Sequence, residues 1–205
     1  MNRCFICGET IEDTFNNIFD CNVSVCYKCF NKFKIRNDSF SIKNCKGVIL
    51  YYYNDFFKDV LFMYKGMGDY CLKDVFLLYY KNELKRKYKG YILVLAPSNE
   101  ESELKRGFCH LEEIFKSLDL KIIKCFKKNA IWKQSDKKLK EREEIQNVIK
   151  IDKSMLSGVK KVLIVDDVLT SGSTIKTMIS QIPSNIVKKV LVLSSNCQIM
   201  ANEIV

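Results

Sequence analysis

The residues Val162-Leu163-Ile164-Val165-Asp166-Asp167-Val168-Leu169-Thr170-Ser171-Gly172-Ser173-Thr174 decide the fold class of this 205-residue chain. The stretch begins with four consecutive apolar residues, a pattern typical of a strand that is buried on both faces. A short polar turn follows, and the apolar spacing beyond it predicts a helix through Ile175, Met178, Ile179 and Ile182. A strand, a turn and a helix in this order favour an α/β fold.

Strand and helix signals alternate on both sides of this stretch. We predict strands at residues 48–53, 91–95, 120–126 and 187–193, and helices at residues 55–65, 69–87 and about 104–118. Such alternation predicts a parallel sheet with helices on both faces. We expect this domain to occupy residues 46–205. Residues 1–45 contain few side chains that can build a core, so they are predicted to form a separate small unit.

The end of the buried strand carries groups that suit a phosphate and a sugar. Carboxylates such as Asp166 and Asp167 accept hydrogen bonds from ribose hydroxyls or hold Mg²⁺ through water. The turn after them offers backbone N–H groups and hydroxyls at a helix N-terminus, which favours an anion. The candidate residues of this turn are Thr170, Ser171, Gly172, Ser173 and Thr174.

Two other interpretations fit parts of this stretch. A strand end capped by Asp and followed by an N-capped helix would need neither two acids nor the full turn. A Walker B strand also fits four hydrophobic residues followed by Asp166 and Asp167. No glycine of the chain begins a G-x4-G-K-[ST] loop, however, so a P-loop ATPase is excluded.

Four of the ten cysteines form two C-x2-C pairs, Cys4 with Cys7 and Cys26 with Cys29. Two such pairs can complete a tetrahedral sulfur shell, which suits a structural Zn²⁺. Zinc would stabilise a segment that is too small to fold on its own core. The alternative is a set of reduced thiols that bind nothing, and Cys21 is a possible substitute ligand.

The chain carries 34 basic and 24 acidic residues, a formal net charge of +10. Because most of the basic residues are Lys in a chain of skewed composition, this charge permits an anionic partner without establishing one. Basic residues cluster at 121–142, with Phe126 and Trp132 among them, and in the cysteine unit at Lys28, Lys32, Lys34 and Arg36. No apolar stretch approaches about 20 residues and no signal core is present, so we expect a cytoplasmic protein without membrane insertion.

The thirteen-residue stretch is similar to the 5-phosphoribosyl 1-diphosphate (PRPP) signature of type I phosphoribosyltransferases. A zinc ribbon in front of such a domain resembles the ComF/ComFC family of competence proteins. Further matches occur in family order at Tyr51-Tyr52-Tyr53-Asn54, Lys65, Gly68-Asp69, Arg106-Gly107-Phe108, Lys133-Gln134-Ser135 and Arg142. Three residues depart from the family pattern: Cys109 and His110 stand in place of Asn-Gln, and Ser171 in place of Thr.

The resemblance implies a type I phosphoribosyltransferase-like fold that binds PRPP, or a similar phosphorylated ribose, together with Mg²⁺. In it, Asp166 and Asp167 would hold the ribose hydroxyls and residues 170–174 the 5′-phosphate, with Lys65 or Arg106 at the diphosphate. Asp166, Asp167 and Arg106 are thus the catalytic candidates, although turnover is not implied. His110, the chain's only histidine, is expected to be a core or half-exposed imidazole and not a catalytic base.

The family role implied is assistance to DNA internalisation during natural transformation. It would involve single-stranded DNA and a ComFA-like helicase or translocase, at the inner face of the membrane near the uptake channel. The alternative function is that of a nucleotide-salvage phosphoribosyltransferase. Such an enzyme would release diphosphate from PRPP in the presence of a purine or pyrimidine base.

Overall fold

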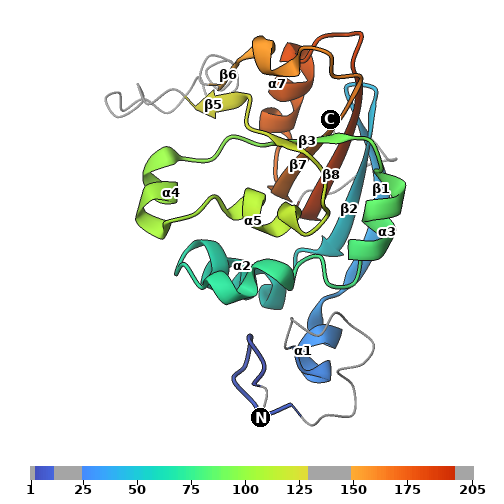
Figure 1. The fold of residues 1–205 in the computed structure, drawn as a ribbon. Coiled ribbons are helices and arrows are strands. Elements are labelled where there is room, and N and C mark those ends of the chain that lie inside the picture. Colours follow the sequence, from blue (N-terminus) through green and yellow to red (C-terminus); the bar gives the residue numbers. More distant parts are fainter. Residues whose placement is uncertain (1–2, 12–24, 129–148, 197–205) are drawn as a thin grey trace.

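The computed structural model describes residues 3–11, 25–128 and 149–196 of the chain. Its centre is a six-stranded sheet with the strand order β1-β2-β8-β7-β3-β4 (Figure 1). Each neighbouring pair is parallel except β1 and β2, which form an antiparallel hairpin. The strands are β1 (Ile35–Ile42), β2 (Cys45–Tyr52), β3 (Ile92–Leu95), β4 (Ile122–Ile123), β7 (Lys161–Leu169) and β8 (Val187–Ser195).

Helices connect the parallel strands. They are α2 (Asp55–Lys65), η1 (Tyr70–Asp74), α3 (Lys81–Lys87), α4 (Glu100–Arg106), α5 (His110–Lys116), η2 (Lys153–Leu156) and α7 (Ser173–Gln181). The connections from β2 to β3 and from β3 to β4 run in one direction along the sheet, whereas the β7–α7–β8 connection runs in the other. Since such crossovers are right-handed, α2 to α5 cover one face and α7 covers the opposite face. The predicted fold class is confirmed.

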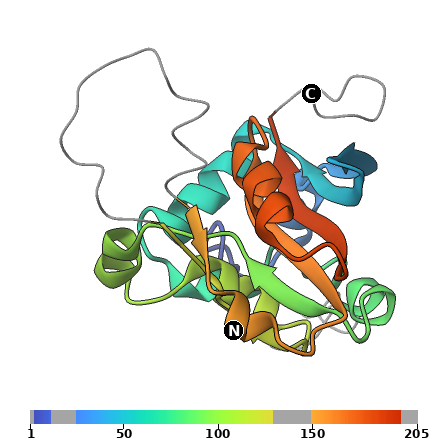
Figure 2. The ribbon, with the colours of Figure 1, turned by 90° about the horizontal axis from the view of Figure 1, so that it is seen from above.

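Two smaller pieces flank this sheet. Helix α1 (Tyr27–Lys32) precedes β1 and carries the second cysteine pair. Strands β5 (Phe126–Lys128) and β6 (Ile149–Ile151) form a separate antiparallel pair that packs against α7 (Figures 1 and 2).

The core lies between the central strands and the α2–α5 layer. Residues 162–165 of β7 have no exposed area, as expected for a strand covered on both faces. Several of the largest buried side chains are tyrosines whose hydroxyls donate to main-chain oxygens. Tyr64 donates to the carbonyl of His110 at 2.9 Å, and Tyr80 donates to that of Leu50 at 3.0 Å. These bonds offset the cost of burying the hydroxyl groups.

One predicted helix is confirmed from end to end. Helix α2 spans Asp55–Lys65, and its N-cap Asn54 accepts a hydrogen bond from the backbone N–H of Phe57. The apolar spacing places Phe56, Val60 and Met63 on one face of this helix, and the structure confirms only Val60 as buried. Phe56 and Met63 are only partly buried, whereas Phe57, Leu61 and Tyr64 join Val60 in the core.

Two predicted helices and one strand are broken in the structure. The stretch 69–87 contains η1 and α3 separated by a turn. The stretch 104–118 divides into α4 and α5, because Gly107 adopts φ +84° and ends α4 in a left-handed conformation. Leu104, whose spacing helped to predict the helix at 104–118, is 83% exposed. The strand expected at 120–126 is limited to β4, and Phe126 already belongs to β5.

Strand β1 was not predicted, and it joins the first segment to the large sheet by pairing with β2 across the expected domain boundary at residues 45 and 46. The hairpin pairs Ile42 with Cys45 and Ile35 with Tyr51, so residues 35–42 belong to the large sheet. The division into a zinc ribbon of residues 1–45 and a domain of residues 46–205 stays a prediction. The hairpin nevertheless places the last part of that first segment in the sheet.

Candidate functional site

The candidate site lies at the topological switch point of the sheet, where the connections after two neighbouring strands run in opposite directions. Strands β3 and β7 are neighbours, with Leu95 paired to Val165, yet the chain leaves them toward opposite faces. The carboxyl ends of strands at such a switch point are where open α/β sheets bind ligands. Asp166, Asp167 and the turn to α7 follow at this position, beside the loop that leaves β3.

Asp166 and Asp167 have different surroundings. Both belong to β7, and consecutive side chains of a strand point to opposite faces of the sheet. Asp167 is 7% exposed and meets two side chains from the α2–α5 layer. Its Oδ2 atom lies 2.5 Å from Lys65 Nζ and 3.2 Å from His110 Nε2. Its Oδ1 atom accepts the backbone N–H of Val168 at 2.7 Å.

The partners of the two acids shift their pKa values in opposite directions. Burial and the neighbouring Asp167 carboxylate raise the pKa of Asp166. Burial alone would also raise the pKa of Asp167. The hydrogen bond from His110 and the positive charge of Lys65 outweigh it and hold that pKa below its usual range. The pair therefore carries its negative charge preferentially on Asp167.

The turn after β7 has the geometry of an anion site. Gly172 adopts φ 70°, a left-handed conformation that favours glycine, and serves as the N-cap of α7. Ser171 Oγ lies 2.9 Å from Ser173 Oγ. Thr170 and Ser171 are exposed, and Ser173 and Thr174 are half-buried. The first turn of α7 leaves backbone N–H groups free of helical partners, so hydroxyls and amides gather at one place.

A shallow pocket, open to solvent, lies beside this edge of the sheet. The loop that leaves β3 forms one wall through Leu95, Ala96, Pro97 and Ser98. Lys124, Lys127 and Lys128 line it as well, and the charge of Lys128 favours the ionised form of Asp166. Two acids also line the pocket, Glu100 and Glu103. Lys128 near Asp166 and Lys65 beside Asp167 suit a ligand that carries phosphate groups.

Arg106 lies in the neighbourhood of Lys65 without an ion pair of its own among the described residues. Its Cζ atom sits 5.8 Å from the ring centroid of Phe108, which in turn packs against Tyr64 at 5.3 Å. Its Nη1 atom is buried and has no hydrogen-bond partner in the described parts of the chain. An arginine with an unsatisfied buried donor fits a site that gains an acidic ligand.

His110 is the site residue whose role the sequence did not predict. The imidazole is buried, as expected, but it lies against Asp167. Its Nδ1 atom is buried and has no partner among the described residues. Only the packing of α5 over the end of β7 brings His110 and Asp167 together, and 57 positions of sequence separate them. No local sequence pattern predicts such a contact.

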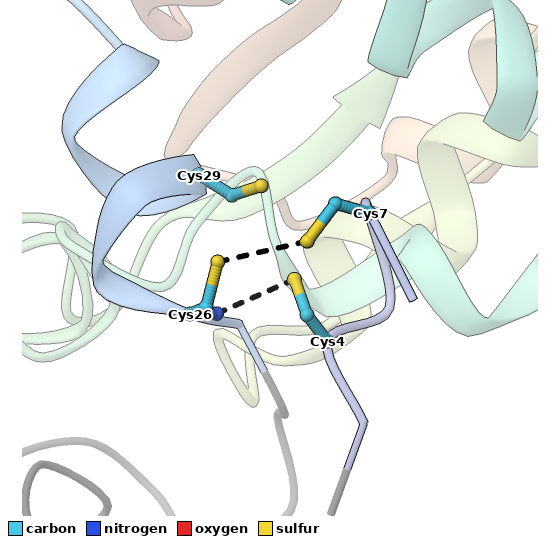
Figure 3. Close-up of side chains that lie close together, drawn as sticks. All are labelled: Cys4, Cys7, Cys26 and Cys29. Carbon is cyan, nitrogen blue, oxygen red and sulfur yellow. Dashed lines mark hydrogen bonds between the residues drawn. The ribbon is translucent and has the colours of Figure 1, made fainter. Parts of the chain in front are cut away.

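The four paired cysteines form a second site (Figure 3). Cys4 and Cys7 come from the N-terminal segment, and Cys26 and Cys29 from the start of α1. All four sulfur atoms lie within 4.8 Å of one another, and Cys7 Sγ is 3.7 Å from Cys26 Sγ. Zinc–sulfur bonds of about 2.3 Å in a tetrahedron place sulfur atoms about 3.8 Å apart, so the donors fit Zn²⁺ in type and in spacing.

The backbone around Cys4 favours its thiolate, whereas burial and the neighbouring cysteines raise the pKa of Cys29. The N–H of Cys26 donates to Cys4 Sγ at 3.3 Å. Burial alone would raise the pKa of Cys4, but backbone N–H donors led by that of Cys26 outweigh it and lower the pKa to about 7. Metal ligation requires the thiolate form, so these bonds support the same assignment.

Several predicted residues lie outside the described part of the chain. They include Cys21, Trp132, Lys133, Gln134, Ser135 and Arg142. Most of the basic segment 121–142 falls there too, and Lys121, Lys124, Lys127 and Lys128 are its described members. Within the described residues, no helix is both long enough and apolar enough to cross a bilayer.

Comparisons with known proteins give matches of different weight. No protein-family model matches the chain. A hypoxanthine phosphoribosyltransferase from Staphylococcus aureus aligns with 72% of this chain and 72% of its own, at 15% identity and a TM-score of 0.35. A TM-score this low does not establish a shared fold.

Two curated proteins match by sequence. The competence protein ComFC of Streptococcus pneumoniae (strain ATCC BAA-255 / R6) is 28% identical over 199 residues, which cover 84% of this chain and 90% of that protein. The competence protein ComFC of Bacillus subtilis (strain 168) is 28% identical over 140 residues, 67% of this chain and 57% of that protein. The strand–turn–helix motif and the cysteine cluster thus lie in a chain that is similar, over most of its length, to competence proteins named ComFC.

Proposed function

We propose that this protein binds PRPP, or a similar phosphorylated ribose, together with Mg²⁺ at the carboxyl ends of β3 and β7. The observation that carries the proposal is the joint position of the acidic pair and the hydroxyl-rich turn at the switch point of the sheet. Residues 170–174 would hold the 5′-phosphate. Lys65 and Arg106 would face the diphosphate, whose charge a bound Mg²⁺ would neutralise in part.

Calorimetry with Mg²⁺ and PRPP tests this proposal. The double variant Asp166→Ala, Asp167→Ala should lose binding, whereas Asp59→Ala, which removes an exposed carboxylate on α2, should bind as the wild type does. Ribose 5-phosphate and diphosphate alone should each bind more weakly than PRPP, because each fills only part of the site. Equal affinity of the wild type and the double variant would refute the proposal.

We further propose that the ComFC-like role is to handle single-stranded DNA during its internalisation in natural transformation. Three exposed lysines and two exposed tyrosines lie on or next to α1 and at the open end of the β1–β2 hairpin, where the N–H of Tyr52 donates to the carbonyl of Lys34. Lys28, Lys32 and Lys34 are exposed, Tyr27 is 63% exposed and Tyr52 is 51% exposed. Lysines neutralise phosphates, and tyrosine rings offer stacking surfaces for unpaired bases. A ComFA-like helicase or translocase, acting at the inner face of the membrane, would be the partner in this role.

Charge reversal tests the DNA part. Lys28→Glu, Lys32→Glu and Lys34→Glu together should weaken single-strand binding and reduce its salt dependence. Each phosphate contact contributes about 0.7 to the slope of log K against the logarithm of the salt concentration. The control variant carries Glu in place of the exposed Lys150, Lys153 and Lys160, so it has the same net charge as the first triple variant. If both triple variants lose affinity equally, net charge and not this surface accounts for binding.

A transformation assay separates the two proposals. A strain without the protein is complemented with the wild type, the Asp166/Asp167 double variant or Cys4→Ser. Rescue by the double variant would show that the sugar-phosphate site is dispensable for DNA uptake. Diphosphate release from PRPP with a panel of purine and pyrimidine bases would instead favour the nucleotide-salvage alternative.

A further inference from the structure

The two acids of the candidate site differ in how fully their oxygen atoms are used. The oxygens of Asp167 accept three hydrogen bonds, from Lys65 Nζ, His110 Nε2 and the N–H of Val168. Asp166 accepts the N–H of Asp167 at its Oδ1 atom, at 2.9 Å, and its side chain is half-buried. A carboxylate offers about four acceptor positions. Asp167 is therefore largely committed inside the protein, whereas Asp166 keeps acceptor capacity for a ligand.

We propose that the two carboxylates have divided roles: Asp167 is an internal anchor held by Lys65 and the positioning residue His110, and Asp166 alone accepts the hydroxyls of the bound sugar. The identity of the ligand rests on the proposed function. The anchor does not depend on it, because its contacts exist within the protein itself. The resemblance implied instead that both acids hold ribose hydroxyls.

His110 is well placed to fix Asp167. Its main-chain carbonyl accepts the hydroxyl of Tyr64 at 2.9 Å, so the start of α5 is tied to α2 next to Lys65. The Lys65 side chain is 41% exposed, whereas that of His110 is 9% exposed. A half-exposed lysine retains rotamer freedom, but a buried imidazole has little. His110 thus sets the direction of the Asp167 carboxylate, and with it the backbone that carries Asp166.

The anchor can be tested without any ligand. His110 is the only histidine, so the imidazole ¹⁵N signals of the tag-free, zinc-loaded full chain belong to one residue. Asp167→Asn should shift the Nε2 signal, because the acceptor loses its charge. Asp166→Asn, the matched control one position away, should leave the signal in place. Equal shifts in both variants, or none in either, would overturn the anchor.

The ligand-facing role needs calorimetry with Mg²⁺ and PRPP. Asp166→Asn should weaken binding about tenfold, the size expected for one lost hydrogen bond, because an NH₂ donor replaces one of the two acceptor oxygens, and it should leave the imidazole signals unchanged. His110→Gln should bind within about threefold of the wild type, because its amide still donates to Asp167, whereas His110→Leu should lose at least about tenfold.

Other outcomes of the calorimetry count against the proposal. If His110→Gln is as weak as His110→Leu, the donated hydrogen bond is not what His110 contributes. If Asp166→Asn binds like the wild type, Asp166 does not hold the sugar. If the wild type binds no PRPP, the proposed function and the ligand-facing role of Asp166 both fail, and the imidazole spectra alone decide the anchor.

Discussion

The cysteine unit, residues 3–11 and 25–32, and the central sheet are stabilised in different ways. Among residues 3–11 and 25–32, the buried side chains are Cys4 and Cys29, both members of the cluster. In β7, residues 162–165 are fully enclosed by apolar neighbours. The first region therefore has a cluster of candidate metal ligands in place of an apolar core, and the second has a core of apolar side chains. We therefore expect loss of a cysteine to unfold mainly the cysteine unit, and loss of a core side chain to destabilise mainly the sheet.

Removal of a metal ligand should give the largest effect. We expect Cys29→Ser to abolish stoichiometric zinc binding and to unfold the cysteine unit, because a structural zinc contributes an apparent 10–16 kcal/mol, roughly, to a small unit. Zinc content by mass spectrometry and amide hydrogen exchange would measure this. Cys71→Ser, an exposed position outside the cluster, is the matched control. Loss of exchange protection throughout β7 in Cys29→Ser would break the comparison.

A cavity in the sheet should give the next largest effect. Ile164→Ala removes a fully buried side chain and should lower the free energy of unfolding by about 2–5 kcal/mol. Urea denaturation followed by tyrosine fluorescence would measure it. The zinc content should remain that of the wild type. A variant that also loses its zinc would show that the cysteine unit depends on the sheet for its own fold.

A smaller effect is expected at the break between α4 and α5. Gly107→Ala should lower the free energy of unfolding by about 1 kcal/mol, because alanine is strained at φ +84°. A Cβ atom at this position meets no other atom within 4 Å, so backbone conformation is the only cost. Thermal unfolding would measure the change. An unchanged or higher melting temperature would mean that the left-handed conformation of Gly107 is not needed to separate the two helices.

The smallest predicted effect is a gain in stability at the acidic pair. The pKa of Asp166 is higher in the folded state than in the unfolded state, where it is about 3.9. The contribution of Asp166 to the free energy of unfolding is therefore fully present below about pH 3.9 and is lost as the pH rises through its pKa in the folded state. Asp166→Asn should therefore raise the melting temperature at pH 8, by a few degrees for about 1 kcal/mol, with little gain near pH 4. Asp59→Asn is the exposed control. A gain that does not depend on pH would contradict this account.

The sequence predicted those parts of the fold that depend on local pattern. Strand β7, helix α2 and the two C-x2-C pairs each have a signal that lies within a few residues. Strand β1 lacks one, because it is an edge strand with polar residues such as Arg36 and Asp38 and only two buried side chains, Phe40 and Ile42.

The parts that could not be predicted depend on backbone conformation or on distant contacts. Apolar spacing continues through Gly107, so periodicity alone does not reveal the left-handed residue that ends α4. The contact of His110 with Asp167 depends on α5 packing over β7. The acidic pair itself was predicted from its motif, but its asymmetry was not, since it arises from partners on α2 and α5.

The irregularity in β1 has a consequence for association between copies of the protein. The register shifts between Ile35 and Asp38, where Asn37 adopts φ 49°, so this outer strand does not present a flat row of main-chain groups. At the opposite edge, β4 is only two residues long. Both borders of the sheet are thus poor templates for adding a foreign strand, which protects a chain rich in β-forming residues from amyloid-like stacking.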